Sequence, residues 1–135
     1  MKLAHIAIGL FFSSGLLAIT ACPKTASQSQ ITNLTEKDSA KTLTISKGRE
    51  FTLTLPTRTD GGYRFDKEQY DTTILRLEKH IEKAPPANSA LGSPGELMWQ
   101  FIALKNGGTS LKITASRPWT KVGAVTEFEN TVVVK

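Results

Sequence analysis

The clearest indication of the fold is in residues 91–119, which read LGSPGELMWQFIALKNGGTSLKITASRPW. In two runs, 96–104 and 109–115, large apolar residues alternate with other residues, and a period of two is typical of half-buried β-strands. Asn106-Gly107-Gly108 predicts a hairpin between them, because Asn and Gly adopt positive φ at little cost. Two reversing strands bring their outer ends together. We therefore expect Ser93-Pro94-Gly95 and Arg117-Pro118-Trp119 at one end of the molecule.

Short apolar runs of the same kind fill the rest of the chain, with turn signals between them. The expected strands are residues 41–46, 50–55, 63–65, 74–79, 96–104, 109–115 and 126–135. No segment shows a convincing helical period. Regular short strands over about 95 residues favour an all-β fold, an immunoglobulin-like antiparallel β-sandwich of about seven or eight strands. The chain has one cysteine, so packing alone must hold the two sheets together.

The first residues have the features of an export signal. Lys2 precedes a mostly apolar run, residues 6–19, and such a signal is removed from the mature protein. The run is short for a membrane span, which needs roughly 20 residues. Ile19-Thr20-Ala21-Cys22 resembles a bacterial lipobox, in which the cysteine is lipidated and becomes the mature N-terminus. Lipidation also accounts for a lone Cys22, which otherwise would be a free thiol in a simply secreted protein.

Three parts are therefore expected: a lipoprotein signal peptide at 1–21, a flexible tether at 22–40 that carries the lipid on Cys22, and a folded domain at 41–135. The tether is polar, with only Ile31 and Leu34 as bulky apolar residues, so it cannot offset its ordering entropy by burial. The expected location is the bacterial cell envelope. Pro23 in place of an aspartate favours the outer membrane or a periplasm-facing anchor.

Composition argues against several functional classes. The formal net charge is +5 and falls by one when Lys2 leaves with the signal, and no basic run interleaved with aromatic residues suggests nucleic-acid binding. His80 is the only histidine after the signal, and we interpret it as a surface residue, so a Cys/His pair is not available. No ligand cluster has zinc spacing, and Asp60, Asp66 and Asp71 lack the compact acidic loop of a calcium site. We expect neither an enzyme, nor a metal, nor a cofactor.

Three connections gather at one end if consecutive strands alternate in direction. They are residues 56–62, 84–95 and 116–123. Each has a simpler interpretation. Residues 60–62 could form only a turn, residues 85–95 could be a disordered crossover, and Trp119 could fold back on the core. Two features argue against these simpler interpretations: the middle loop is long, and Trp and Arg are frequent among binding hot spots. The sequence therefore predicts a binding edge.

The order of these features resembles a known family. A glycine-rich loop, the strand residues Trp99 and Phe101, a Gly-Gly turn and an Arg-Pro-Trp loop are similar to the chagasin family of cysteine-protease inhibitors, over residues 43–134. The resemblance implies a monomer whose three loops occlude the active-site cleft of papain-like cysteine proteases, reversibly and without covalent chemistry. The protease-binding residues that it implies are Thr59, Asp60, Gly61, Gly62, Tyr63, Gly92, Ser93, Pro94, Gly95, Arg117, Pro118 and Trp119.

The first loop departs from the family pattern. That pattern reads Asn-Pro-Thr-Thr-Gly, then Tyr or Phe, any residue and Trp, whereas residues 58–65 of this chain read RTDGGYRF. Gly62 and Tyr63 match, and Phe65 is a conservative replacement. In the middle loop, Pro94 stands where glycine is common. An alternative function therefore stays open, in which an adhesion or assembly module of the cell envelope keeps the sandwich without inhibition.

Overall fold

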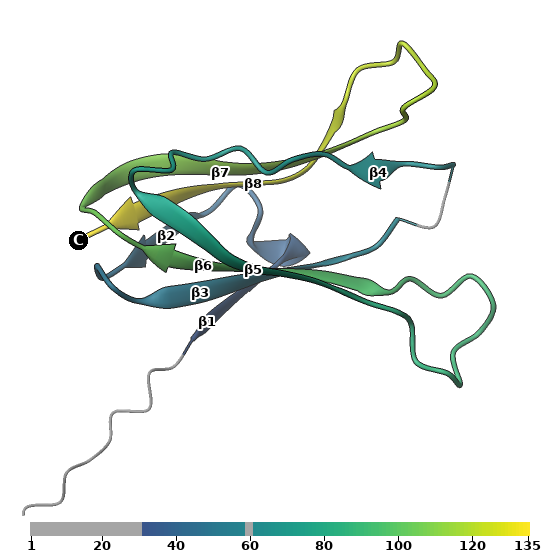
Figure 1. Ribbon diagram of the computed structural model, residues 1–135, viewed down its shortest axis with the longest axis horizontal. Coiled ribbons are helices and arrows are strands. Elements are labelled where there is room, and N and C mark those ends of the chain that lie inside the picture. Colours follow the sequence, from purple (N-terminus) through teal and green to yellow (C-terminus); the bar gives the residue numbers. More distant parts are fainter. Residues whose placement is uncertain (1–30, 59–60) are drawn as a thin grey trace, which may run out of the picture.

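The computed structural model describes residues 31–58 and 61–135, which form two packed four-stranded sheets (Figure 1). The first sheet has the strand order β1-β3-β6-β5 and the second β2-β8-β7-β4. The elements are β1 (Thr32–Thr35), η1 (Glu36–Asp38), β2 (Thr42–Ile45), β3 (Glu50–Pro56), β4 (Arg64–Phe65), β5 (Leu75–Lys83), β6 (Glu96–Ala103), β7 (Gly107–Ser116) and β8 (Val125–Val134). The predicted immunoglobulin-like sandwich is confirmed, with eight strands in the described residues.

Alternating apolar residues build the core between the sheets. In β6, Leu97, Trp99 and Phe101 are buried while their neighbours are more exposed. β3 lies beside β6 in antiparallel register, and Phe51 stacks on Phe101 with ring centroids 5.3 Å apart. β7 and β8 bury Leu111, Ile113, Phe128 and Val132 from the opposite side. Burial of this apolar surface is the main stabilising contribution, because no disulfide joins the sheets.

Most neighbouring strands are antiparallel, as predicted, but the outermost N-terminal pairs are parallel. β1 runs parallel to β3 and β2 runs parallel to β8. The chain begins in the first sheet, crosses through η1 and continues in the second sheet. It thereby adds one parallel edge strand to each sheet.

The predicted hairpin between residues 96–104 and 109–115 is wrong in its pairing. β6 lies in the first sheet between β3 and β5, whereas β7 lies in the second sheet between β8 and β4. The turn reverses the chain but carries it from one sheet to the other. Gly107 has φ of 150°, and a Cβ there would lie 3.1 Å from Cδ1 of Ile74. A period of two shows which face of a strand is buried, but does not show which strand pairs with it.

The expected tether at 22–40 is wrong over residues 32–40. β1 pairs with residues 51–54 of β3, and Leu34 is only 6% exposed in the common core. The Thr52 hydroxyl donates a hydrogen bond to the Asn33 side chain. One buried leucine and four paired residues offset the ordering entropy of this short segment. The folded domain therefore begins at β1 and not at residue 41. The signal, Cys22 and the rest of the tether lie outside the described residues.

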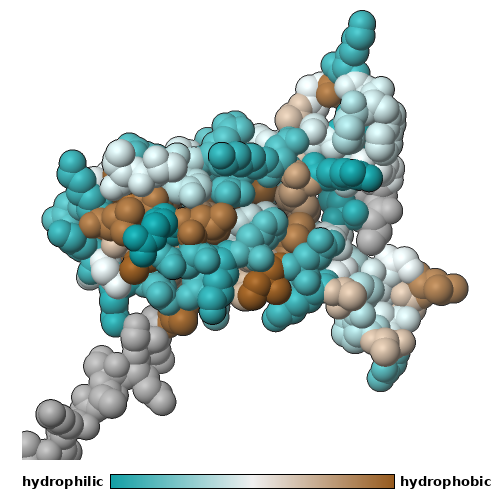
Figure 2. Space-filling model, in the orientation of Figure 1, coloured by the Kyte–Doolittle hydropathy of each residue, from teal (hydrophilic) through white to brown (hydrophobic). Residues whose placement is uncertain are grey.

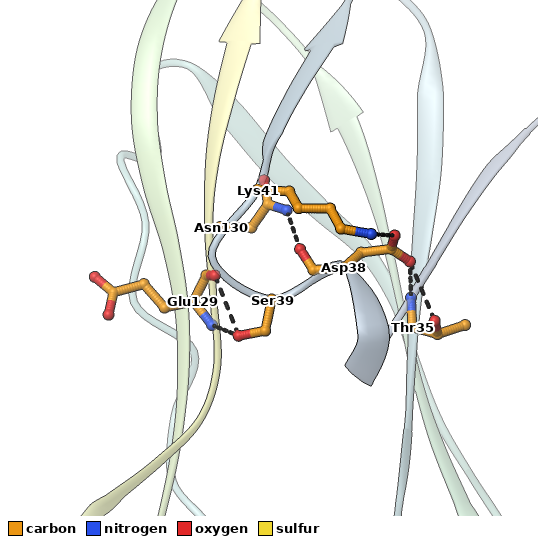
Figure 3. Close-up of polar contacts among 6 residues, drawn as sticks. All are labelled: Thr35, Asp38, Ser39, Lys41, Glu129 and Asn130. Carbon is orange, nitrogen blue, oxygen red and sulfur yellow. Dashed lines mark hydrogen bonds and ion pairs between the residues drawn. The ribbon is translucent and has the colours of Figure 1, made fainter.

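A polar network fixes the crossing between the sheets (Figure 3). The carboxylate of Asp38 accepts hydrogen bonds from the backbone N–H and the hydroxyl of Thr35, at 3.0 and 3.1 Å. Lys41 Nζ lies 3.0 Å from the same carboxylate. Asn130 of β8 donates to the Asp38 carbonyl at 2.8 Å, which joins η1 to the second sheet. In the described part of the chain, no helix is long and apolar enough to cross a membrane.

Candidate functional site

Three connections lie together at one end of the sandwich (right in Figure 1). They are the first loop (residues 57–63, between β3 and β4), the second loop (84–95, between β5 and β6) and the third loop (117–124, between β7 and β8). The C-terminus and the start of β1 lie at the opposite end. The predicted clustering of these connections is confirmed. A rigid sandwich that carries adjacent loops is a common basis for binding sites.

The third loop begins with a tight turn. The Thr120 N–H donates to the Arg117 carbonyl at 3.1 Å, and Pro118 occupies the second position, where its fixed φ favours a turn. Trp119 follows and is 66% exposed. Of the two alternatives left open by the sequence, folding back on the core is excluded. The indole ring lies against the first loop and keeps most of its surface open to solvent.

Two glycines of the first loop leave space for side chains of the third loop. Gly61 and Gly62 have φ of +60° and +69°, values that favour glycine. A Cβ on Gly62 would lie 2.2 Å from Cη2 of Trp119, and one on Gly61 would lie 2.2 Å from Nη2 of Arg117. The side chains of the third loop therefore fill the space that these glycines leave. Thr59 and Asp60, also predicted as binding residues, lie outside the described residues.

Tyr63 joins the two loops through its ring. The guanidinium carbon of Arg117 lies 4.4 Å from the ring centroid, and that of Arg58 lies 4.7 Å from it. Both distances are within the range of cation–π attraction. Arg58 Nε also lies 2.9 Å from Oε1 of Glu127 in β8. Arg58 and Glu127 are site residues that the sequence does not predict, because the two are far apart in the chain and no local pattern connects them.

The second loop is closed at its base by backbone contacts. The Thr57 N–H donates to the Gly95 carbonyl at 2.9 Å, and the Gly95 N–H donates to the Thr57 hydroxyl at 2.7 Å. A Cβ on Gly95 would lie 2.3 Å from the Lys83 carbonyl oxygen, so a larger residue does not fit there. Farther out, Gly92 has φ of +83° in a turn closed by the hydrogen bond from Ser93 N–H to Ala90 carbonyl. Pro94, between these glycines, is exposed.

The most exposed large apolar side chains of the described residues all lie on the second and third loops. They are Leu91, which is fully exposed, Val122 at 67% and Trp119 at 66%. Figure 2 shows these two loops as separate lobes, with an apolar projection at the outer end of the second. Leu91 was missed by the sequence analysis, although it directly precedes the predicted Gly92. Exposed apolar groups concentrated at one end of a molecule are typical of a protein-binding surface.

The residues considered for other chemistry have structural partners. Asp66 accepts hydrogen bonds from the hydroxyls of Thr114 and Ser116, at 2.9 and 2.6 Å. Asp71 accepts from the hydroxyl of Thr73 at 2.7 Å. Within the described ranges, no group of three or more His, Cys, Asp and Glu residues could hold a metal ion.

His80 is an exposed residue of β5, as the sequence predicted. Its ring stacks on Trp99 with centroids 4.9 Å apart. It lines a hollow of about 350 Å³ beside the first loop, together with Glu82 and Arg64. This hollow is open and lined by residues of both charge signs.

Comparison with known proteins agrees with this geometry. The model of the family "Chagasin family peptidase inhibitor I42" matches residues 44–134. Amoebiasin-2 of Entamoeba histolytica is 36% identical over 98 residues, which cover 72% of this chain and 79% of that protein. The crystal structure of the cysteine protease inhibitor EhICP2, from the same organism, has a TM-score of 0.68 at 32% identity and covers 78% of this chain and 96% of that one.

A more distant likeness concerns the fold alone. The structure of PbICP-C in complex with falcipain-2 has a TM-score of 0.54 at 16% identity, covering 79% of this chain and 92% of that one. The family match spans both sheets and all three loops. The expectation of an inhibitor rather than an enzyme is confirmed, because this chain belongs to the chagasin family of peptidase inhibitors.

Proposed function

We propose that this protein is a reversible, non-covalent inhibitor of papain-like cysteine proteases, which it blocks by placing its three loops across the active-site cleft. The observation that carries the proposal is the loop end itself, where Leu91, Trp119 and Val122 are the most exposed large apolar side chains of the described residues. Two relatives add support. EhICP2 is a cysteine protease inhibitor, and PbICP-C forms a complex with falcipain-2.

The second loop suits a substrate groove. Residues 84–95 contain no charged side chain, and Gly92, where nothing lies within 4 Å of a Cβ, lets the backbone approach another backbone closely. Gly95 is buried against the Lys83 carbonyl at the base of the loop. The base of the loop is fixed by the two hydrogen bonds between Thr57 and Gly95. A loop whose base is already held in place loses less entropy on binding than a free one. Gly92, Ser93 and Pro94 would lie along the groove, with Leu91 as an apolar anchor. Gly95, expected from the sequence to lie there too, is buried and instead holds the base of the loop.

The third loop would bind beside the cleft. Pro118 restricts the turn, and Trp119 presents most of its indole to solvent. Tryptophan and arginine are enriched among the residues that dominate interface energies. We therefore assign Arg117, Pro118 and Trp119 to the protease-facing surface. The first loop, with Gly61, Gly62 and Tyr63, lies between the other two.

A titration tests the proposal directly. The soluble chain from residue 31 to residue 135 is added to papain and to a cathepsin, and peptide hydrolysis is followed. We expect competitive inhibition at nanomolar concentration. Absence of inhibition at tens of micromolar by a folded sample would contradict the proposal and favour an adhesion or assembly module of the cell envelope.

We also propose that the chain is monomeric and anchored in the bacterial cell envelope by lipid on Cys22. Cys22 is the only cysteine and follows a signal-like run, which supports lipidation. Attachment of more than one acyl chain gives stable membrane binding without a membrane-spanning helix. Incorporation of labelled palmitate that is lost in Cys22→Ser tests the anchor. Equal labelling of both proteins would contradict it.

A further inference from the structure

We propose that the first loop acts through the third loop, and that Arg58 and Tyr63 are positioning residues that hold Arg117 and Trp119 in the binding conformation. This inference rests on the proposed function and specifies how its site is organised. In this view, Arg58, Gly61, Gly62 and Tyr63 are adapted to the Arg-Pro-Trp turn. They are not a weakened form of a loop with threonine at position 61.

A chain of contacts leads from the sandwich to Arg117, which begins the turn that carries the exposed Trp119. It begins at Glu127 in β8, a strand that pairs along its length with β7. Arg58 Nε lies 2.9 Å from its carboxylate, and the two side chains are 31% and 18% exposed. Arg58 lies over Tyr63, and Tyr63 in turn lies against Arg117. Partial burial reduces the screening of these charges by solvent and salt. The position of the Arg117 side chain is thereby fixed relative to a rigid strand.

The two glycines complete the arrangement. Arg117 extends over Gly61 and the Trp119 indole lies over Gly62. A Cβ on Gly61 would meet only the flexible end of an arginine, which can move away. A Cβ on Gly62 would meet the rigid indole, which must leave its place. Gly62 is therefore the position at which the first loop determines the orientation of Trp119.

Contacts between the first loop and the side chains of Arg117 and Trp119 would strengthen binding through preorganisation. An exposed tryptophan on a turn can adopt several rotamers, and ordering a side chain on association costs about 0.5–1.5 kcal/mol. Contacts within the free inhibitor that select one rotamer remove part of this cost. A threonine at position 61 would adopt φ of +60° only with strain, so a first loop with threonine at that position does not fit this backbone.

The first test uses the free protein. Because the indole lies over Gly62, its ring current should shift the Gly62 Hα resonances away from ordinary glycine values in the NMR spectrum. We expect Tyr63→Leu and Arg58→Gln to move these resonances toward ordinary values, and Tyr63→Phe to preserve them. Arg76→Gln is the matched control, since it removes a comparable Nε–Oε1 pair (2.6 Å, with Glu78) in β5, outside the loops. An unchanged Gly62 shift in folded Arg58→Gln, which keeps the neighbouring Tyr63 ring and its own ring current, would overturn the inference.

The second test uses inhibition of papain. We expect Tyr63→Leu to raise the inhibition constant about tenfold and Tyr63→Phe to leave it within about threefold, since an aromatic ring suffices for the cation–π contact. In a Trp119→Ala background, Tyr63→Leu should have a smaller further effect, exerted through Arg117 alone, because residues that act through one another are not additive. Full additivity would overturn the positioning role and indicate that Tyr63 contacts the protease itself.

The two tests separate the failure of this inference from the failure of the proposed function. If the wild-type chain inhibits no papain-like protease, the proposed function is wrong, and the NMR comparison still decides whether Arg58 and Tyr63 position Trp119. If inhibition is strong and Tyr63→Leu changes neither the spectrum nor the inhibition constant, the proposed function stands and the coupling of the loops is wrong.

Discussion

Gly62 has a backbone conformation that favours glycine, and it also lies against Trp119 of the proposed binding surface. Its φ is +69°, and a Cβ would lie 2.2 Å from the Trp119 ring. We expect Gly62→Ala to lower the free energy of unfolding by about 1 kcal/mol, because alanine is strained at positive φ. Inhibition should weaken at least tenfold, roughly 1.4 kcal/mol, because the indole is displaced. Urea unfolding and inhibition titrations measure the two effects.

Two other loop glycines serve as controls for Gly62→Ala. Gly92 has φ of +83° with nothing within 4 Å of a Cβ, and Gly123 has open space and no positive φ. In the free protein, Gly92→Ala should lower the free energy of unfolding through backbone strain without moving the Trp119 indole, and Gly123→Ala should do neither. Inhibition is not compared for Gly92→Ala, because Gly92 is assigned to the protease-facing surface. Equal NMR shifts of the Trp119 indole in Gly62→Ala and Gly92→Ala would contradict the steric explanation.

Trp119 itself should matter for binding and not for folding. We expect Trp119→Ala to weaken protease binding by about 2 kcal/mol or more, as at an interface hot spot. The free energy of unfolding should stay within about 0.5 kcal/mol, because substitutions at exposed sites away from the core have small effects. Ile31→Ala is the control, since Ile31 is also exposed, at 43%, but directly precedes β1, which runs parallel to β3 toward the loop end and so begins away from it. Unchanged inhibition by Trp119→Ala would remove the third loop from the site.

At the scale of elements, β1 contributes through one side chain. Leu34 is 6% exposed and belongs to the core. We expect Leu34→Ala to lower the free energy of unfolding by about 2–3 kcal/mol, the lower part of the range for buried leucines, because β1 is an edge strand that can partly relax. Denaturant unfolding of the chain from residue 31 onward measures the loss. A change below that of the exposed control Ile31→Ala would show that β1 does not belong to the cooperative core.

The network at η1 should make stability depend on pH. Hydrogen bonds from Thr35, together with Lys41, lower the pKa of Asp38 below its ordinary value. A carboxylate with a depressed pKa stabilises the folded state above the ordinary pKa, and this contribution is lost as the pH falls through the folded-state value. Wild type should therefore be more stable than Asp38→Asn at pH 7, and the difference should shrink below about pH 4. A difference that persists unchanged to pH 3, measured by urea unfolding, would contradict this origin.

The sequence predicted the elements that carry a strong period. The buried positions of Trp99 and Phe101 identify β6. The clustering of the three loops at one end follows from strands that alternate in direction along the chain. β1 escaped prediction because TNLT contains a single buried residue and its partner, β3, is not the next strand in the chain. Motif comparison could find Gly62, Tyr63 and Trp119 because they match locally. Arg58 and Glu127 required the fold, since only the packing of β8 beside the first loop brings them together.

At the scale of the whole molecule, the chain enters the sandwich at the end opposite its three loops (Figure 1). β1 runs parallel to β3 toward the loop end, so residue 32 lies away from it. An anchor at Cys22 would therefore leave the loops free to meet a soluble protease. This arrangement is independent of which membrane carries the lipid.

The orientation can be tested with the mature chain from residue 22, coupled through the Cys22 thiol to phosphatidylcholine vesicles that contain a maleimide lipid. We expect the inhibition constant for papain to stay within about threefold of that of the uncoupled protein, because a site at the far end keeps its access and its contacts. The matched variant carries Cys22→Ser and Gly123→Cys, a third-loop position with open space around a Cβ, and is coupled through the third loop. It should lose inhibition on vesicles and retain it in solution. Loss of inhibition on coupling through Cys22 would show that the loop end faces the membrane.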